Sequence, residues 1–228
     1  AVLFTAVVFA FVPTFLALVV WVAITWIIGG LIARVSIRQA LAVGRVVVAL
    51  VVGALVLNVP WVSQFANSQW MDHFVGSQAA SVQQVGLTHL ARFDGGILRF
   101  GIIALGLYIP VFVSVVVTRS TTFIWATRSL SLVVFTGLLI VLIDSDVLNI
   151  AAPSFGQLLA VVACGLALGA GALASFVFDD ELTSAYRWWK PVVTGAVIAS
   201  LVGALPAVSM AVGGSWNQSN SVVADLYT

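Results

Sequence analysis

The sequence predicts an all-α protein, a polytopic bundle of about six transmembrane helices. Hydrophobic residues make up 62% of the chain and charged residues only 7%, whereas a soluble domain carries about 25% charged residues. Apolar runs near the length of about 20 residues that crosses a bilayer recur along the chain. Basic residues gather in alternate connectors between these runs, as they do in multi-pass membrane proteins.

The apolar runs define six spans within what we interpret as one membrane domain, residues 1–228. The first run extends back to Ala1, so Pro13 either kinks it or separates a short re-entrant segment from the span. We expect one long, tilted helix, because the residues before Pro13 are too few to cross alone. Pro110 is expected to bend the third span, as a static kink or as a hinge. The approximate bounds of the spans are 11–33, 45–61, 96–118, 129–143, 155–178 and 191–212.

The distribution of charge predicts how the chain lies in the membrane. The connectors on one side hold Arg34, Arg38, Arg45, Arg119, Arg128, Arg187 and Lys190. Those on the other side hold only Arg92 and Arg99 among basic residues. By the positive-inside rule the first set is cytoplasmic, and both termini are then extracytoplasmic. Arginine outnumbers lysine eight to one, a bias that indicates a bacterial source and hence the plasma membrane.

The predicted extracytoplasmic connector over residues 62–95 is longer than the others and rich in Gln and Ser. Its apolar residues recur at near-helical spacing, which predicts one or two short amphipathic helices on the outer membrane surface. His73 and His89 lie in this segment near Asp72 and Asp94. Their spacing matches no metal or catalytic motif, so we interpret them as interfacial polar residues.

Small residues in the last two spans predict close helix packing. Lipid gives helices no hydrophobic drive to associate, so packing depends on small residues that let two backbones approach. We expect the fifth and sixth spans to pack on each other; a contact between two copies of the chain or a thin pore wall is the alternative. The small residues are Gly165, Gly169, Gly171, Ala163, Ala167 and Ser175 in the fifth span, and Gly195, Ala199, Gly203 and Ala207 in the sixth.

Ionisable residues inside a membrane are costly and usually functional, yet none lies near the middle of a predicted span. This pattern disfavours proton-coupled transport, and we expect no cofactor, no metal site and no catalytic residue. The nearest charges lie at the outer rim, where Arg99 enters the third span, Asp94 precedes it and Asp144 ends the fourth. An ion pair of Arg99 with Asp94 or Asp144 would orient helices or, alternatively, gate an anion or ion.

Two classes of function fit these observations. The first is a non-catalytic membrane scaffold, an assembly subunit or an anchor of a larger envelope complex, which small-residue faces and charge-free span centres favour. The second is a passive channel or facilitator for ions or small solutes. The expected partners are membrane lipids, together with other membrane subunits or further copies of the chain. No basic run is present, so nucleic acid is not an expected partner.

Overall fold

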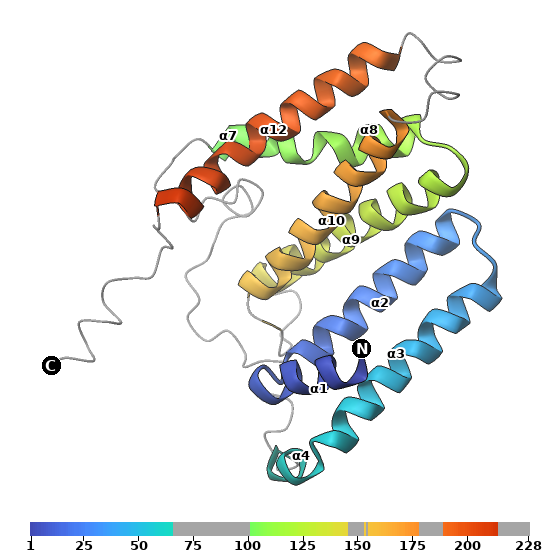
Figure 1. Ribbon diagram of the computed structural model, residues 1–228, viewed down its shortest axis with the longest axis vertical. Coiled ribbons are helices and arrows are strands. Elements are labelled where there is room, and N and C mark those ends of the chain that lie inside the picture. Colours follow the sequence, from blue (N-terminus) through green and yellow to red (C-terminus); the bar gives the residue numbers. More distant parts are fainter. Residues whose placement is uncertain (66–100, 146–152, 154, 178–188, 214–228) are drawn as a thin grey trace, which may run out of the picture.

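The computed structural model describes residues 1–65, 101–145, 153, 155–177 and 189–213, and every regular element among them is a helix (Figure 1). These elements are α1 (Val2–Phe11), α2 (Phe15–Ile32), α3 (Ile37–Leu57), α4 (Val59–Phe65), α7 (Gly101–Ala104), η1 (Leu105–Leu107), α8 (Ile109–Val117), α9 (Ser120–Asp144), α10 (Phe155–Val177) and α12 (Lys190–Gly213). The all-α class is therefore confirmed for this part of the chain.

Four of the described helices are long and apolar enough to cross a membrane. The qualifying stretches are Phe15–Ile32, Ile37–Leu57, Thr121–Ile143 and Gly156–Phe176. They correspond to the first, second, fourth and fifth predicted spans. The third and sixth predicted spans contain shorter apolar helices, Leu105–Val117 and Lys190–Leu205. Of the predicted segment 62–95, only residues up to Phe65 are described, and they belong to α4.

The helices form a row (Figure 1). The hairpin of α2 and α3 lies on one side, with α2 against α9; α9 packs along the length of α10, and α8 and α12 cover the other side. The central core lies between α8, α9 and α10, where Val111, Val133, Leu158 and Val162 are buried. A second cluster joins α12 to α8 and α10 through Val117, Leu173, Phe176, Val193 and Ala196.

The expected long first helix is wrong, because the chain breaks at Pro13. Helix α1 ends at Phe11 and α2 begins at Phe15, and α1 folds back to pack on α3. Proline lacks the N–H that a continuous helix needs. The docked position is fixed by Asn58, whose side-chain amide donates 3.1 Å to the carbonyl of Ala6 and 2.9 Å to that of Ala54.

Two helices begin earlier than their hydropathy indicates. Helix α3 starts at Ile37, just after Ser36, whose side chain caps it by accepting a hydrogen bond from the Gln39 amide. Helix α9 starts at Ser120, so Arg128, which the sequence places in a connector, lies about two turns inside a helix. In both cases polar residues extend the helix beyond its apolar centre.

The third predicted span is interrupted. A four-residue turn of α-helix, α7, is followed by the 3₁₀ turn η1 and then by α8, which starts at Ile109. Pro110 lies in the first turn of α8, where its missing N–H costs no helical hydrogen bond. The bend that Pro110 predicts is therefore present as a break in the helix one turn before α8.

Candidate functional site

Two glycines of α10, Gly165 and Gly169, face α9 and α8. A methyl group at Gly165 would lie 2.8 Å from Val133 Cγ2, and one at Gly169 would lie 2.6 Å from Val111 Cγ2. The Ser129 hydroxyl of α9 donates a 2.7 Å hydrogen bond to the Gly165 carbonyl. The GxxxG step is therefore a close-packing element, but its partners are α9 and α8 in place of the sixth span.

The glycine of α12 that contacts another helix is Gly203. A methyl group there would lie 2.9 Å from the Leu107 nitrogen and 3.1 Å from the Ile103 carbonyl oxygen. Gly106 opposes it, because a methyl group at Gly106 would collide with the carbonyl oxygen of Ala199. The break in the third span and the small residues of α12 thus form one tight crossing.

The remaining predicted packing glycines meet no neighbour among the described residues. A methyl group at Gly171 or Gly195 would have no described atom within 4 Å. On α10, Ala163, Ala167 and Ser175 are exposed together with Gly171. Since these residues recur every fourth position, the small-residue face of α10 lies open on the described surface.

Of the predicted rim residues, the structure describes only Asp144. Arg99 and Asp94 lie outside the described residues, and so do His73 and His89. Asp144 is the last residue of α9. Within the described part of the chain, no cluster of His, Cys, Asp or Glu is arranged to hold a metal ion.

Buried hydroxyl groups in the described interior are used within the protein. Thr25 and Thr127 donate to carbonyls of their own helices at 2.9–3.2 Å. Thr118 does the same at 2.6 Å, and Thr136 accepts a 3.1 Å hydrogen bond from the Trp21 indole. The Trp21–Thr136 bond joins α2 to α9, whereas the hydroxyls of Thr25, Thr118 and Thr127 bond back to their own helices and do not donate into a water-filled passage.

Arg128 is the one described cation enclosed by aromatic rings. Its guanidinium carbon lies 4.8 Å from the ring centre of Trp26 on α2 and 5.7 Å from that of Trp125 on its own helix. The two rings meet edge to face at 5.4 Å. The Arg128 Nε is buried and has no hydrogen-bond partner among the described residues. Cation–π contact offsets part of the hydration that the guanidinium has lost.

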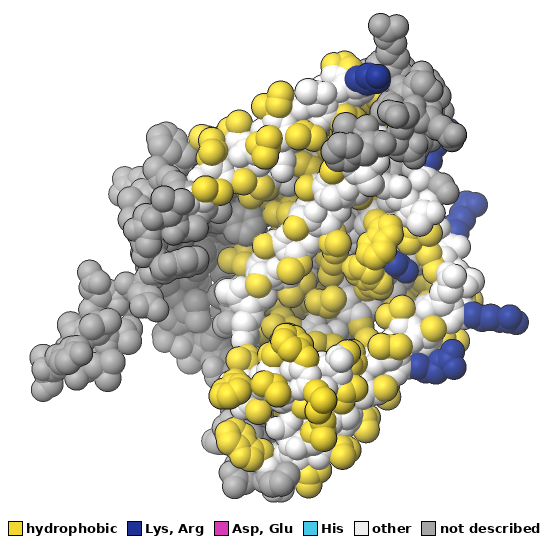
Figure 2. Space-filling view, viewed as in Figure 1, with side chains coloured by type: hydrophobic (Ala, Val, Ile, Leu, Met, Phe, Trp, Pro, Cys, Tyr) yellow, Lys and Arg dark blue, Asp and Glu magenta, His cyan; other side chains and the backbone are white. Residues whose placement is uncertain are grey.

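Glycines at the end of α2 make room for Arg128. A methyl group at Gly29 would lie 2.7 Å from the Arg128 Cα, so the two backbones approach closely at this point. A methyl group at Gly30 would lie 3.5 Å from the guanidinium, which therefore rests against the α2 backbone. The described basic side chains gather toward one edge of the molecule (Figure 2). Arg128 lies between Trp26 of α2 and Trp125 of α9.

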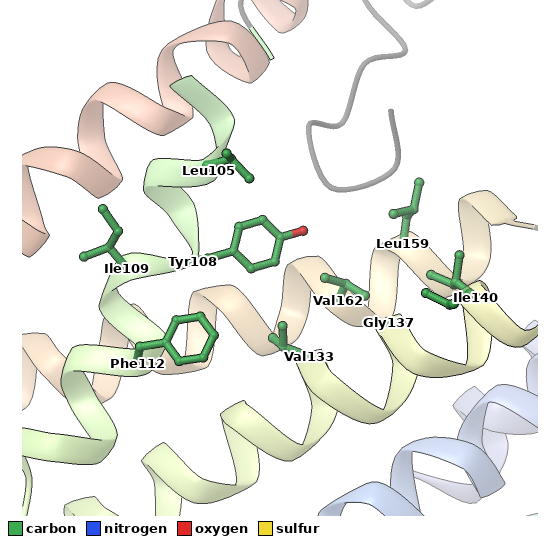
Figure 3. Close-up of a pocket in the computed structure, with 10 residues that line it drawn as sticks. Leu105, Tyr108, Ile109, Phe112, Val133, Gly137, Ile140, Leu159 and Val162 are labelled. Carbon is green, nitrogen blue, oxygen red and sulfur yellow. The ribbon is translucent and has the colours of Figure 1, made fainter. Parts of the chain in front are cut away.

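Among the described helices, two cavities are of a size to hold a ligand. The smaller, about 500 Å³, lies between α8, α9 and α10, and its lining includes Tyr108, Phe112, Val133 and Leu159 (Figure 3). The larger, about 810 Å³, is a groove over α2 with α1 and α3 on one side and α10 on the other. Trp26 lines this groove and also contacts Arg128.

No protein-family model, curated protein or solved structure matches the chain.

The contacts of Arg128 were not predicted, because the hydropathy pattern places this residue in a connector. One signal was available, because Trp125 precedes Arg128 by three residues and therefore shares its face of the helix. The contribution of Trp26 comes from another helix and leaves no such signal.

Proposed function

We propose that this chain is a non-catalytic membrane subunit that assembles with other membrane chains through the open face of α10. The observation that carries the proposal is the exposed row Ala163, Ala167, Gly171 and Ser175. A row of small residues at four-residue intervals lets a second helix approach closely in lipid. The partner is another subunit of an envelope complex or a second copy of the chain. Substitution of Ala167 tests this assignment, with the particle mass as the readout.

A passive channel or facilitator is the alternative function. The apolar linings of both cavities and the internally bonded hydroxyl groups disfavour it. In a channel, the rim charges of Arg99, Asp94 and Asp144 would form a gate. In the scaffold proposal, the same residues orient helices or contact lipid headgroups.

Reconstitution into liposomes separates the two functions. The purified chain is expected to give ion and solute fluxes equal to those of protein-free liposomes, and an imposed pH gradient is expected to drive no uptake. The physical reason is that no predicted span places an ionisable group at its centre. Uptake driven by the gradient and abolished by Asp144→Asn would show that the chain is a transporter.

We further propose a six-span topology in the plasma membrane of a bacterium, with both termini extracytoplasmic. Arg34, Arg38, Arg119 and Lys190 lie at or beside helix ends, and the described basic side chains gather toward one edge of the molecule, which supports a cytoplasmic assignment of that edge (Figure 2).

Cysteine labelling checks the topology. After Cys164→Ala, single cysteines at Ser36 and Ser184 are expected to be shielded from a membrane-impermeant maleimide added to intact cells. Cysteines at Ser77 and Ser219 are expected to react. Labelling of the first pair with protection of the second would invert the orientation, and one reactive member in each pair would change the number of spans.

A further inference from the structure

Arg128 has donors that the described residues leave unused. A guanidinium carries five N–H donors. Two tryptophan faces cover Arg128, its buried Nε has no hydrogen-bond partner, and no described residue forms an ion pair with it. Aromatic faces offset part of the desolvation of a cation, but they do not satisfy the N–H donors of a guanidinium with conventional hydrogen bonds. A ligand with several anionic oxygens would satisfy both the charge and the planar donor set.

The apolar groove begins beside the same arginine. Trp26 forms one end of it, and Phe15 lies toward the other, eleven residues earlier on α2. At 1.5 Å per residue the groove extends about 16 Å along α2. One leaflet of the hydrocarbon core is about 15 Å deep, so the groove has the length of a leaflet. Its lining is formed by residues such as Val19, Val22 and Ala160.

The Arg128 side chain is also oriented so that its guanidinium can bind a lipid headgroup. It lies eight residues after Ser120, about 12 Å from the start of α9. Side chains on a helix tilt toward its N-terminus, and the N-terminus of α9 is at the basic edge of the molecule. The guanidinium therefore extends toward the headgroup layer while the groove runs away from it into the bilayer.

We propose that Arg128 and this groove together bind an anionic phospholipid. The phosphate lies against the Arg128 guanidinium, and one acyl chain lies in the groove along α2 between α3 and α10. A net negative lipid is favoured over a zwitterionic one because the described site holds a cation without an ion-pair partner. The site contains none of the four residues that form the open face of α10, but Ala160 and Cys164 of its lining lie on the same side of that helix.

Native mass spectrometry of the full chain in detergent tests the proposal, with palmitoyl-oleoyl phosphatidylglycerol as the probe. We expect the chain to retain this lipid and to prefer it over the phosphatidylcholine of the same acyl chains. Arg128→Gln is expected to weaken retention about tenfold or more, because hydrogen bonds to charged groups are among the strong ones. Arg38→Gln, an exposed arginine at the same edge, is the control and is expected to leave retention unchanged.

A second variant tests the groove apart from the charge. Ala160→Phe fills the groove while keeping Arg128 and is expected to weaken retention of phosphatidylglycerol. Ala49→Phe adds the same bulk on an exposed position outside the groove and is the control. Equal retention of both lipids, unchanged binding by Arg128→Gln, or unchanged binding by Ala160→Phe would each overturn the proposal. Inorganic phosphate that competes fully with the lipid would also overturn it, since the acyl chain would then contribute nothing.

Discussion

Gly169→Leu is expected to prevent the central core from assembling, and Gly169→Ala to lower its free energy of unfolding by about 1–3 kcal/mol, the usual cost of overpacking. The added methyl group would lie 2.6 Å from Val111 Cγ2, 2.7 Å from Ser129 Oγ and 3.0 Å from Val111 Cα. Val111 is fully buried and belongs to the core cluster, so displacing it would disturb the packing of its neighbours. Unfolding of the purified chain in detergent, followed by tryptophan fluorescence, measures the effect.

Gly171→Ala is the matched control, two residues along the same helix. A methyl group there meets no atom within 4 Å, and alanine is a better helix former than glycine by about 1 kcal/mol. The variant is expected to be as stable as the parent chain or slightly more so. If the two alanine variants unfold alike, the α8–α9–α10 contact at Gly169 is not the close approach that the geometry describes.

The same contrast applies to α12. Gly203→Leu is expected to detach α12 from η1, because the added side chain would meet the backbone of Leu107 and Ile103. Val202→Leu changes an exposed neighbour and is expected to be tolerated.

The sequence predicted the apolar centres of the helices well and their ends less well. Helices α10 and α12 match their predicted spans to within two residues at each end. Helices α3 and α9 extend about two turns further toward their N-termini than hydropathy indicates. Hydropathy reports which residues prefer lipid, whereas a helix continues through polar residues as long as its backbone hydrogen bonds are kept.

The partners of each helix were harder to predict than the helices themselves. Small residues every fourth position indicate that some backbone will approach, and nothing in the motif names the helix that does. Gly165 and Gly169 thus pack on α9 and α8, while Gly171 and Gly195 remain open. The break at Pro13 was visible in the sequence, but the return of α1 onto α3 depends on Asn58, a contact 52 residues away.

The candidate site was also only partly predictable from the sequence, because its contacts come from two helices. The pair Trp125 and Arg128 can be recognised from helical spacing alone. Its enclosure depends on Trp26, and on Gly29 and Gly30, which bring α2 against α9 at that level. A sequence shows a cation beside an aromatic residue, whereas only the packed helices show that the cation is enclosed and that a groove begins beside it.

Assembly through α10 is the second prediction of large effect. The chain has a mass of 24.0 kDa, and extraction from its own membrane into polymer nanodiscs is expected to yield a particle with additional protein mass. Ala167→Leu is expected to release the chain as a single copy, because a leucine at the centre of the small-residue face blocks close approach of a second helix. Ala167 is exposed, so the substitution leaves the interior of the chain unchanged.

The most direct test of the proposed function is therefore the protein mass of the nanodisc particle for three forms of the chain: the parent, Ala167→Leu and Ala49→Leu. Ala49 is an exposed alanine on α3, flanked by the exposed Val46, Val48 and Val52, and serves as the matched control. The account predicts a heavier particle for the parent and for Ala49→Leu, and a single 24.0 kDa chain for Ala167→Leu. A single chain for the parent, or equal masses for all three forms, would contradict it.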